Sequence, residues 1–306
     1  MNKEEFPLVS FFIVAYKEEK YIREAIQGAF NQDYPNLEII LSDDNSPDNT
    51  FEIMKEMVAS YNGPHKVILN QNVPNLGPRD HYCKVLYELC HGDIIVFADG
   101  DDISDPQRTS VTVDFFNKHP DVVSLSFESC HIDEDGNQIV NRFSNHLSEN
   151  DYSIYTLDDF VRYPLYNLSD DSRAVRRSLV DSFPPLKYSY AEDVFLFVRS
   201  MYLGSYGYIR KPLVAYRQRK DSIMGKSRSQ LFVRKKEVEF FESTTEKQFW
   251  EDYKYAVQKG YIPVNSVDSV KMKIIKSIKN LSPKRKFTIN RIARRVSWFI
   301  DNHFDI

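Results

Sequence analysis

Acidic side chains crowd directly behind a short apolar run, Ile94–Phe97, in the first half of the chain. The run lies between two glycines and is rich in β-branched and aromatic residues, which predicts a buried strand. The carboxylates that follow it are those of Asp99, Asp101, Asp102 and Asp105. Open α/β sheets bind ligands at the carboxyl ends of their strands, so these side chains are candidates for chemistry.

Carboxylates this close together repel one another unless a cation lies among them. Oxygen ligands favour magnesium, manganese or calcium, and the first two beside an α/β crevice are typical of a site for a phosphate-bearing substrate. The alternative is an acidic loop that caps a helix beginning at Pro106, with Asp105 as the N-cap. Capping needs only that one aspartate, so Asp99 and Asp101 are left as candidate metal ligands.

Two further predicted strands end in side chains that suit a nucleotide. The first ends at Ala15 and is followed by Tyr16, whose ring can stack on a base. The second ends at Ser42 and is followed by Asp43 and Asp44. An Asx turn and a helix N-cap explain the residues that come next, but not these two aspartates. An acidic acceptor in this place can take the N3 proton of a uracil ring.

Strands and helices alternate up to residue 127, which predicts βαβ crossovers and a mainly parallel sheet. The expected strands are 9–15, 37–42, 67–70, 93–98 and 122–127, and the expected helices are 19–31, 48–61, 79–90 and 106–118.

After Cys130 the pattern becomes irregular, with hairpin turn chemistry at 133–137. Helices are expected at 157–163, 174–182 and 192–203, and short strands at 206–209 and 213–216. Beyond 227 the chain is helical in character, at 230–241, 246–259, 267–280 and 289–302. We therefore expect a domain at 1–227, with halves at about 1–128 and 129–227, and a helical C-terminal extension at 228–306.

The composition excludes some partners and singles out one segment. The 306 residues carry a formal net charge of −4, which gives no general attraction to nucleic acid. Three cysteines without metal-type spacing and no recognisable leader are typical of a cytoplasmic protein, and no apolar run is long enough to span a bilayer. The segment 269–300 has ten Lys or Arg residues and no Asp or Glu. Its helical apolar spacing predicts either helices on an anionic membrane or a helix pair packed on the rest of the chain.

The motifs between Val9 and Tyr216, taken in order, resemble the family 2 glycosyltransferases. Those enzymes have the GT-A fold and move a sugar from an activated nucleotide donor with inversion at the anomeric carbon. The matching pieces are Ala15-Tyr16-Lys17-Glu18, Ser42-Asp43-Asp44-Asn45-Ser46-Pro47-Asp48-Asn49-Thr50, Asn72-Val73-Pro74-Asn75-Leu76-Gly77, Asp99-Gly100-Asp101-Asp102 and Glu192-Asp193. Each piece alone is weak, but their order on the predicted elements makes the resemblance specific.

The resemblance implies a division of roles in a donor site. Tyr16 would stack on uracil and Asp44 would bind its N3. Asp101 would ligate Mn²⁺ or Mg²⁺, and Asp99 would join it or hold the ribose. The remaining lining residues would be Ala15, Glu18 and Gly100.

Three arginines are further candidates for donor binding. Arg79 follows the Asn75-Leu76-Gly77 turn and would reach the donor phosphate or uracil, although a lone Arg at a helix start is more often solvated. Arg217 and Arg219 stand near the place where many family members carry a His that helps bind metal or diphosphate. Here an arginine is therefore expected to contact the diphosphate directly.

An inverting transfer also needs one carboxylate base that takes the proton of the acceptor hydroxyl. Glu192 and Asp193 begin an apolar predicted helix, whose dipole favours their ionised forms. In the family the Asp of this pair is usually the base, so Asp193 is the expected catalytic residue and Glu192 the second choice. The alternative is that both acids only decorate the first turn of a helix.

The resemblance implies an inverting, metal-dependent hexosyltransferase that uses a UDP-sugar to build a surface polysaccharide such as an O-antigen or capsule unit. The acceptor would be a hydroxyl of a saccharide, either free or linked to undecaprenyl diphosphate. The enzyme would be cytoplasmic and peripheral on the inner face of the plasma membrane, held there by the basic segment 269–300, and nucleic acid is not an expected partner.

Two other classes of protein remain as alternatives. A sugar-phosphate nucleotidyltransferase would open with a Gly-rich, basic loop after its first strand, and Tyr16-Lys17-Glu18-Glu19 contains no glycine. A non-catalytic sugar-nucleotide binding protein would keep Tyr16, Asp44 and Asp101 but would need no base.

Overall fold

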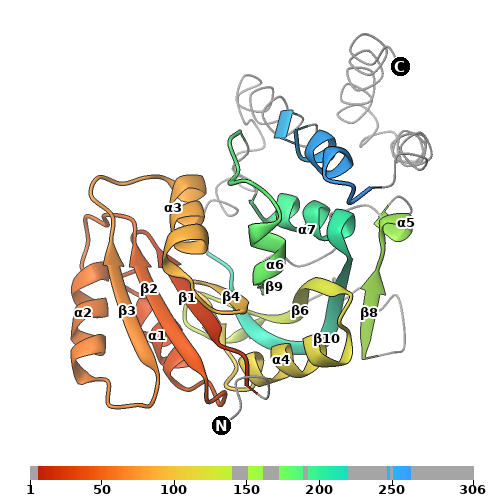
Figure 1. The fold of residues 1–306 in the computed structure, drawn as a ribbon. Coiled ribbons are helices and arrows are strands. Elements are labelled where there is room, and N and C mark those ends of the chain that lie inside the picture. Colours follow the sequence, from red (N-terminus) through yellow and green to blue (C-terminus); the bar gives the residue numbers. More distant parts are fainter. Residues whose placement is uncertain are drawn as a thin grey trace, which may run out of the picture.

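The computed structural model describes residues 6–139, 151–160, 172–188, 192–219, 247–248 and 251–262. These residues form one mixed ten-stranded sheet with helices on both faces (Figure 1). The predicted α/β class, with a curled and mainly parallel central sheet, is confirmed. Several predictions fall outside the described residues. They are the expected helices 230–241, 267–280 and 289–302, the basic segment 269–300 and the expected boundary after 227.

The N-terminal half contains every strand that the sequence predicts there. Its elements are β1 (Val9–Ala15), α1 (Ile22–Phe30), β2 (Leu37–Asp43), α2 (Thr50–Ser60), β3 (Lys66–Gln71), α3 (Pro78–Lys84), the π-helical turn η1 (Val85–Leu89) and β4 (Ile94–Asp99). Strands β1 to β4 pair in parallel, as the alternation of strands and helices predicts.

The second half adds shorter and partly antiparallel elements. They are β5 (Ile103–Ser104), α4 (Arg108–Lys118), β6 (Val122–Ile132), β7 (Gln138–Ile139), β8 (Tyr152–Tyr155), α5 (Leu157–Phe160), β9 (Ala174–Arg176), α6 (Arg177–Asp181), α7 (Glu192–Leu203) and β10 (Ser205–Arg217). The predicted hairpin at 133–137 is confirmed, because β6 and β7 pair antiparallel across that turn.

Two predictions in this half are wrong in detail. The expected helix 174–182 begins as strand β9, which pairs antiparallel with both β4 and β6. Its short apolar run fits a helix and a strand equally well, and the place between two strands decides the outcome. The expected strands 206–209 and 213–216 are one strand, β10, with an irregularity between Ile209 and Val214.

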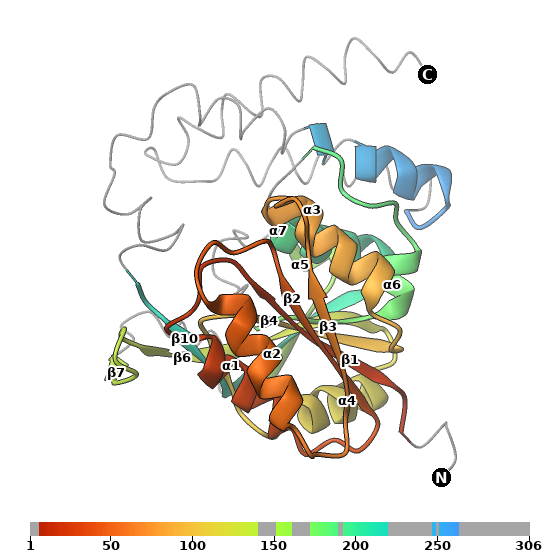
Figure 2. The same ribbon diagram turned by 90° about the vertical axis from the view of Figure 1, so that its left-hand side faces the viewer.

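The strand order is β3-β2-β1-β4-β9-β6-β10-β5, with β7 beside β6 and β8 beside β10. Helices α1, α2 and α4 pack on one face of this sheet, whereas η1, α6 and α7 pack on the other (Figures 1 and 2). Both faces are therefore buried, which is why the parallel strands read as continuous apolar runs.

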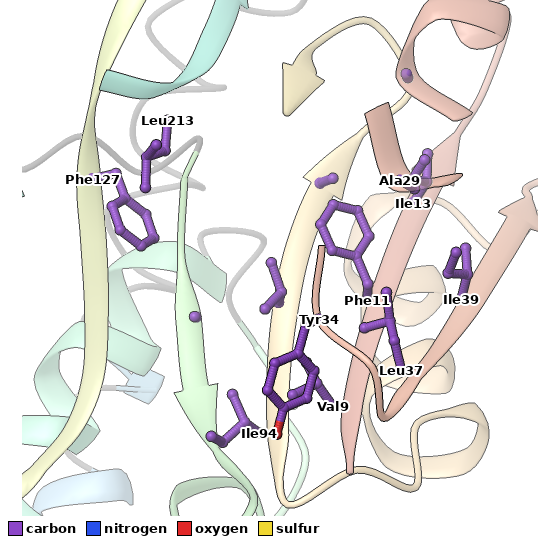
Figure 3. Close-up of a cluster of buried hydrophobic side chains, with 14 of the residues drawn as sticks. Val9, Phe11, Ile13, Ala29, Tyr34, Leu37, Ile39, Ile94, Phe127 and Leu213 are labelled. Atoms are coloured by element: carbon purple, nitrogen blue, oxygen red, sulfur yellow. The ribbon is translucent and has the colours of Figure 1, made fainter. Parts of the chain in front are cut away.

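Side chains of β1 alternate between the two hydrophobic cores. Val9, Phe11 and Ile13 belong to the core beneath α1, where Figure 3 shows them beside residues of β2 and β4. Phe12 and Val14 belong to the core beneath α7. This alternation fixes the register of the strand, because a shift by one residue would exchange the two sets.

Part of the expected C-terminal extension packs on the core. Residues 251–258 are helical, and this segment lies against α7 in Figure 1. Tyr253, Ala256 and Ile262 are buried in the same core cluster as α7. The ring centroids of Phe183 and Tyr255 lie 5.7 Å apart. In the part of the chain that the structure describes, no helix combines the length and apolar character needed to cross a membrane.

Candidate active site

The carboxyl ends of three neighbouring strands bring the predicted motifs to one edge of the sheet. Ala15 at the end of β1 pairs with Asp43 at the end of β2. On its other side β1 pairs with β4, where Val14 lies opposite Asp99. The motifs that follow these strands are therefore neighbours, as the parallel arrangement predicts.

Tyr16 offers the most open aromatic surface at this edge. Its side chain follows β1 and is 44% exposed. The ammonium of Lys17 lies 5.0 Å from the centre of the Tyr16 ring. The backbone turns sharply here, since Lys17 has a φ of 65°. An exposed ring at a strand end is suited to stacking on a planar ligand.

Asp44 is buried and its carboxylate holds the loop 72–77. It accepts hydrogen bonds from the Asn72 side chain at 2.8 Å and from the backbone N–H groups of Leu76 at 2.9 Å and Gly77 at 2.8 Å. Gly77 has a φ of 78°, a conformation that side-chain-bearing residues rarely adopt. Asp44, which was predicted to bind the nucleotide, thus has both carboxylate oxygens hydrogen-bonded to the protein.

Asp43 retains an acceptor that Asp44 lacks. One of its oxygens, Oδ2, accepts from Ser46 N–H at 2.9 Å and from the Gln71 side chain at 3.3 Å. The other, Oδ1, is buried and has no hydrogen-bond partner among the described residues. A buried carboxylate oxygen without a donor is costly, so a ligand N–H group there would be stabilising. Both aspartates are candidates from the sequence, and the hydrogen bonds of the folded chain distinguish them.

The aspartate loop, Asp99 to Asp102, begins at the last residue of β4. The Tyr82 hydroxyl donates to Asp99 Oδ1. Asp102 is buried, and its Oδ1 accepts the backbone N–H of Arg217 at 2.9 Å, which joins the loop to β10. A Cβ on Gly100 would lie 2.9 Å from the Ala15 Cβ, so glycine is required for β1 to approach this closely.

The pKa values of two carboxylates in and beside this loop are raised by burial and by neighbouring negative charge. Burial first, and then the charge of Asp101, raise the pKa of Asp99 to about 6. The same two causes raise the pKa of Glu18 to about 7, although Arg219 opposes them. Repulsion between carboxylates is thus the second cause of both shifts, and a bound cation would relieve that part.

Arg219 is brought into the aspartate cluster from the end of β10. Its guanidinium pairs with both oxygens of Glu18, with a distance of 3.0 Å from Nη2 to Oε1. Its Nε lies 3.1 Å from Oδ2 of Asp101. The Tyr21 ring lies beneath the guanidinium, 5.0 Å from its carbon. Of the two predicted arginines, Arg219 is the one that contacts the side chains of Glu18 and Asp101.

Arg217 is instead used to hold the backbone. It is 2% exposed, and its Nε donates to the carbonyl of Asp101 at 3.0 Å. Its Nη1 donates to the carbonyls of Asp133 and Glu134, at 3.2 and 3.1 Å, and its Nη2 to Glu24 at 2.6 Å. The guanidinium thus joins β10 to the aspartate loop, to the β6–β7 turn and to α1.

Arg79, the third arginine expected at the donor, contacts other groups of the protein. At the start of α3 it donates to the Asp80 carboxylate at 2.7 and 2.9 Å. Its Nη1 donates to the carbonyl of Lys187 at 2.8 Å. These contacts direct Arg79 to the loop that precedes α7.

The two expected base candidates are the first residues of α7. The placement of Glu192 and Asp193 at a helix N-terminus is as predicted, and their side chains lie outside the described part of the structure. The helix behind them is anchored, because Phe195 to Val198 are all buried.

No group of three His, Cys, Asp or Glu side chains that could hold a metal is present within the described residues. The chemistry of the aspartate loop nevertheless fits a hard cation, since Asp99 and Asp101 offer carboxylate oxygens, and burial together with the charge of Asp101 raises the pKa of Asp99. Magnesium commonly uses only one or two carboxylates and takes its other ligands from water and substrate phosphates.

Comparison with known proteins gives the class of this chain. The model of glycosyl transferase family 2 matches residues 10–183, which span the strand ends and the aspartate loop. The chain belongs to this family.

Among curated relatives, Escherichia coli chondroitin synthase is 32% identical over 138 residues, covering 45% of this chain and 19% of that protein. The protein EpsH of Bacillus subtilis (strain 168) is 27% identical over 243 residues, covering 74% of this chain and 66% of its own length. The match to the first of these relatives therefore spans only a fraction of that protein.

Solved structures share the fold at low sequence identity. S. aureus TarS 1–349 in complex with UDP-GlcNAc has a TM-score of 0.60 and 16% identity, covering 96% of this chain and 91% of that one. The mannosyltransferase PcManGT from Pyrobaculum calidifontis, in complex with GDP-Man and Mn²⁺, has a TM-score of 0.56 and 15% identity, covering 98% and 77%. The GT-A fold expected from the motifs is confirmed.

Proposed function

We propose that this protein is an inverting glycosyltransferase that takes a sugar from a UDP-sugar and transfers it to a hydroxyl of a saccharide. The observation that carries the proposal is the convergence of Tyr16, Asp43 and the Asp99–Asp102 loop at one edge of a parallel sheet. Membership of family 2 supports the transfer chemistry, and TarS with UDP-GlcNAc supports a nucleotide-sugar donor in this fold.

On the donor side, the exposed ring of Tyr16 stacks on the base. Oδ1 of Asp43 accepts the N3–H of uracil, because it is an acceptor without a partner in the described protein. Asp44 acts beside it by fixing the loop 72–77. The motif suggested Asp44 as the contact to uracil, and we assign this contact to its neighbour Asp43 instead.

On the diphosphate side, Asp101 and Asp99 would hold Mn²⁺ or Mg²⁺. When bound, such an ion would supply positive charge opposite the leaving diphosphate. Arg219 presents its guanidinium next to Asp101 and donates to the phosphate oxygens, since planar N–H pairs match such oxygens well. PcManGT with GDP-Man and Mn²⁺ supports a metal in this fold.

On the acceptor side, Asp193 takes the proton of the attacking hydroxyl, with Glu192 as the second choice. The acceptor is a saccharide of a surface polysaccharide, such as an O-antigen or capsule unit, free or carried on undecaprenyl diphosphate. The basic segment 269–300 holds the enzyme on the inner face of the plasma membrane, where such lipid-linked acceptors lie. The likeness to a chondroitin synthase supports polysaccharide synthesis.

The substitution Asp193→Asn tests the proposal. Turnover of a UDP-sugar should fall by about 10²-fold or more while UDP binding persists, since loss of a general base has this magnitude. Unchanged turnover would remove Asp193 from catalysis. A protein that binds UDP-sugars but never transfers or hydrolyses the sugar would favour the non-catalytic alternative.

A further inference from the structure

The loop 182–188, which leads into α7, is held by side chains from distant parts of the chain. Gln248 is buried, and its Oε1 accepts the backbone N–H groups of Lys187 at 2.9 Å and Tyr188 at 3.0 Å. The carbonyl of Lys187 accepts from Arg79 of α3. Both backbone groups of Lys187 are thus fixed by side chains that are far away in sequence.

Gln248 is itself fixed by a buried ion pair. Its Nε2 donates to Asp252 Oδ1 at 3.0 Å. Asp252 forms two hydrogen bonds of 2.8 Å with Arg199 of α7, and these two side chains are 2% and 1% exposed. A buried pair of this kind has few alternative geometries, because separating its charges is costly. The amide of Gln248 therefore has a single orientation, with its oxygen toward the loop.

The same network connects the loop to its other side. Arg199 Nη1 donates to the Tyr87 hydroxyl at 3.4 Å, and that hydroxyl lies 3.5 Å from the carbonyls of Phe183 and Pro184. Arg199 also lies over the Phe183 ring, 5.0 Å from its centre. The described residues of the C-terminal segment 247–262, together with α7 and η1, therefore hold one loop between them.

We propose that Gln248 is a positioning residue for transfer. Gln248 holds Lys187 and Tyr188 at the end of the loop 182–188, and α7 begins four positions after Tyr188, at Glu192. The segment 247–262 is then part of the catalytic unit. This inference rests on the proposed role of Asp193, because the residue positioned is the base.

Gln248→Ala tests the inference in the full chain, with Gln258→Ala as a matched control on an exposed face of the same segment. We expect kcat for transfer to fall about tenfold or more in Gln248→Ala, because small misplacements of a catalytic group are expensive. UDP affinity should stay within about twofold of the wild type, since the donor contacts lie on β1, β2 and β4. Gln258→Ala should leave both unchanged.

A conservative variant separates positioning from stability. Gln248→Glu keeps an oxygen for the two N–H groups but places a second carboxylate beside Asp252. It should restore most of kcat while lowering the melting temperature, whereas a merely structural residue would give a kcat that follows the melting temperature. Wild-type kcat in Gln248→Ala, or equal losses of kcat and UDP affinity, would overturn the proposal.

Amide hydrogen exchange tests the positioning role of Gln248 separately from the role of Asp193 as the base. Peptides covering 182–193 should exchange faster in Gln248→Ala than in Gln258→Ala, whatever the activity. Unchanged exchange would overturn the positioning role. Faster exchange in a protein whose Asp193→Asn variant turns over normally would instead count against Asp193 as the base.

Discussion

The guanidinium of Arg219 pairs with the carboxylate of Glu18 across 201 positions of sequence. This contact joins the turn after β1 to the end of β10. Because Arg219 also contacts Asp101, its guanidinium pairs with both acidic motifs that border the proposed diphosphate site. The Arg219 guanidinium therefore lies between these two motifs in the structure.

Arg219→Met should weaken UDP binding in the presence of Mn²⁺ by about tenfold, the usual effect of losing a charge-assisted hydrogen bond. Isothermal titration calorimetry measures the change. Lys20→Met is the control, since it removes one exposed positive charge from the turn after β1 that Arg219 contacts. Equal losses in the two variants would mean that net charge, and not the position of Arg219, matters.

Asp101→Asn should abolish the stabilisation by Mn²⁺ of the UDP-bound protein, because it removes one of the two proposed metal ligands. Thermal unfolding with and without Mn²⁺ provides the measurement. Asp105→Asn serves as the control, since the Asp105 carboxylate accepts the Gln107 N–H at 2.8 Å and an amide oxygen can do the same. An undiminished response to Mn²⁺ in Asp101→Asn would contradict the metal assignment.

Asp43→Asn should lower UDP affinity by about tenfold with little change in stability. Its amide oxygen can still accept from Ser46, but the NH₂ group then faces the N3–H of the ring. Asp44→Asn should instead destabilise the protein by about 1–3 kcal/mol, because an NH₂ group must face the N–H of either Gly77 or Leu76. Calorimetry with UDP and denaturant unfolding distinguish the two. The reverse pattern would return the base contact to Asp44.

His81 should make stability depend on pH below neutrality. Burial lowers the pKa of this histidine below its usual value despite the nearby charges of Asp44 and Asp43, and its Nε2 lies 2.7 Å from Ser42 Oγ. A base with a lowered pKa in the folded state contributes stability above pH of about 6.5 that is lost as pH falls, because only the unfolded state takes up the proton there. The denaturant midpoint should therefore fall more steeply from pH 7 to 5 in the wild type than in His81→Gln. Parallel curves would exclude His81 as the cause.

Truncation after Asn265 should release the protein from anionic vesicles and leave UDP binding intact. The cut removes the basic segment 269–300 but keeps the segment 247–262, which packs on α7. Co-sedimentation with vesicles, followed by UDP titration, measures both properties. Sedimentation that persists after the cut would defeat the membrane role of the basic segment.

The sequence by itself determined the strands β1 to β4, the turn at 133–137 and the positions of the acidic motifs. These follow from local causes, namely apolar runs buried on both faces and turn residues between them. Parallel pairing then requires consecutive strand ends to meet, so the convergence of Tyr16, the Asp43–Asp44 pair and Asp99 was predictable as well.

Only the tertiary structure decided which members of each motif face the site. Asp43 and Asp44 are adjacent in sequence, yet the loop 72–77 occupies only the second. Arg217 and Arg219 are the same residue type two positions apart. Arg217 is nevertheless buried against backbone carbonyls and Glu24, whereas Arg219 contacts the carboxylates of Glu18 and Asp101. The contact of Gln248 with Lys187 depends on how the segment 247–262 packs on α7. Partners this far apart in sequence are chosen by packing, and local patterns carry no record of that choice.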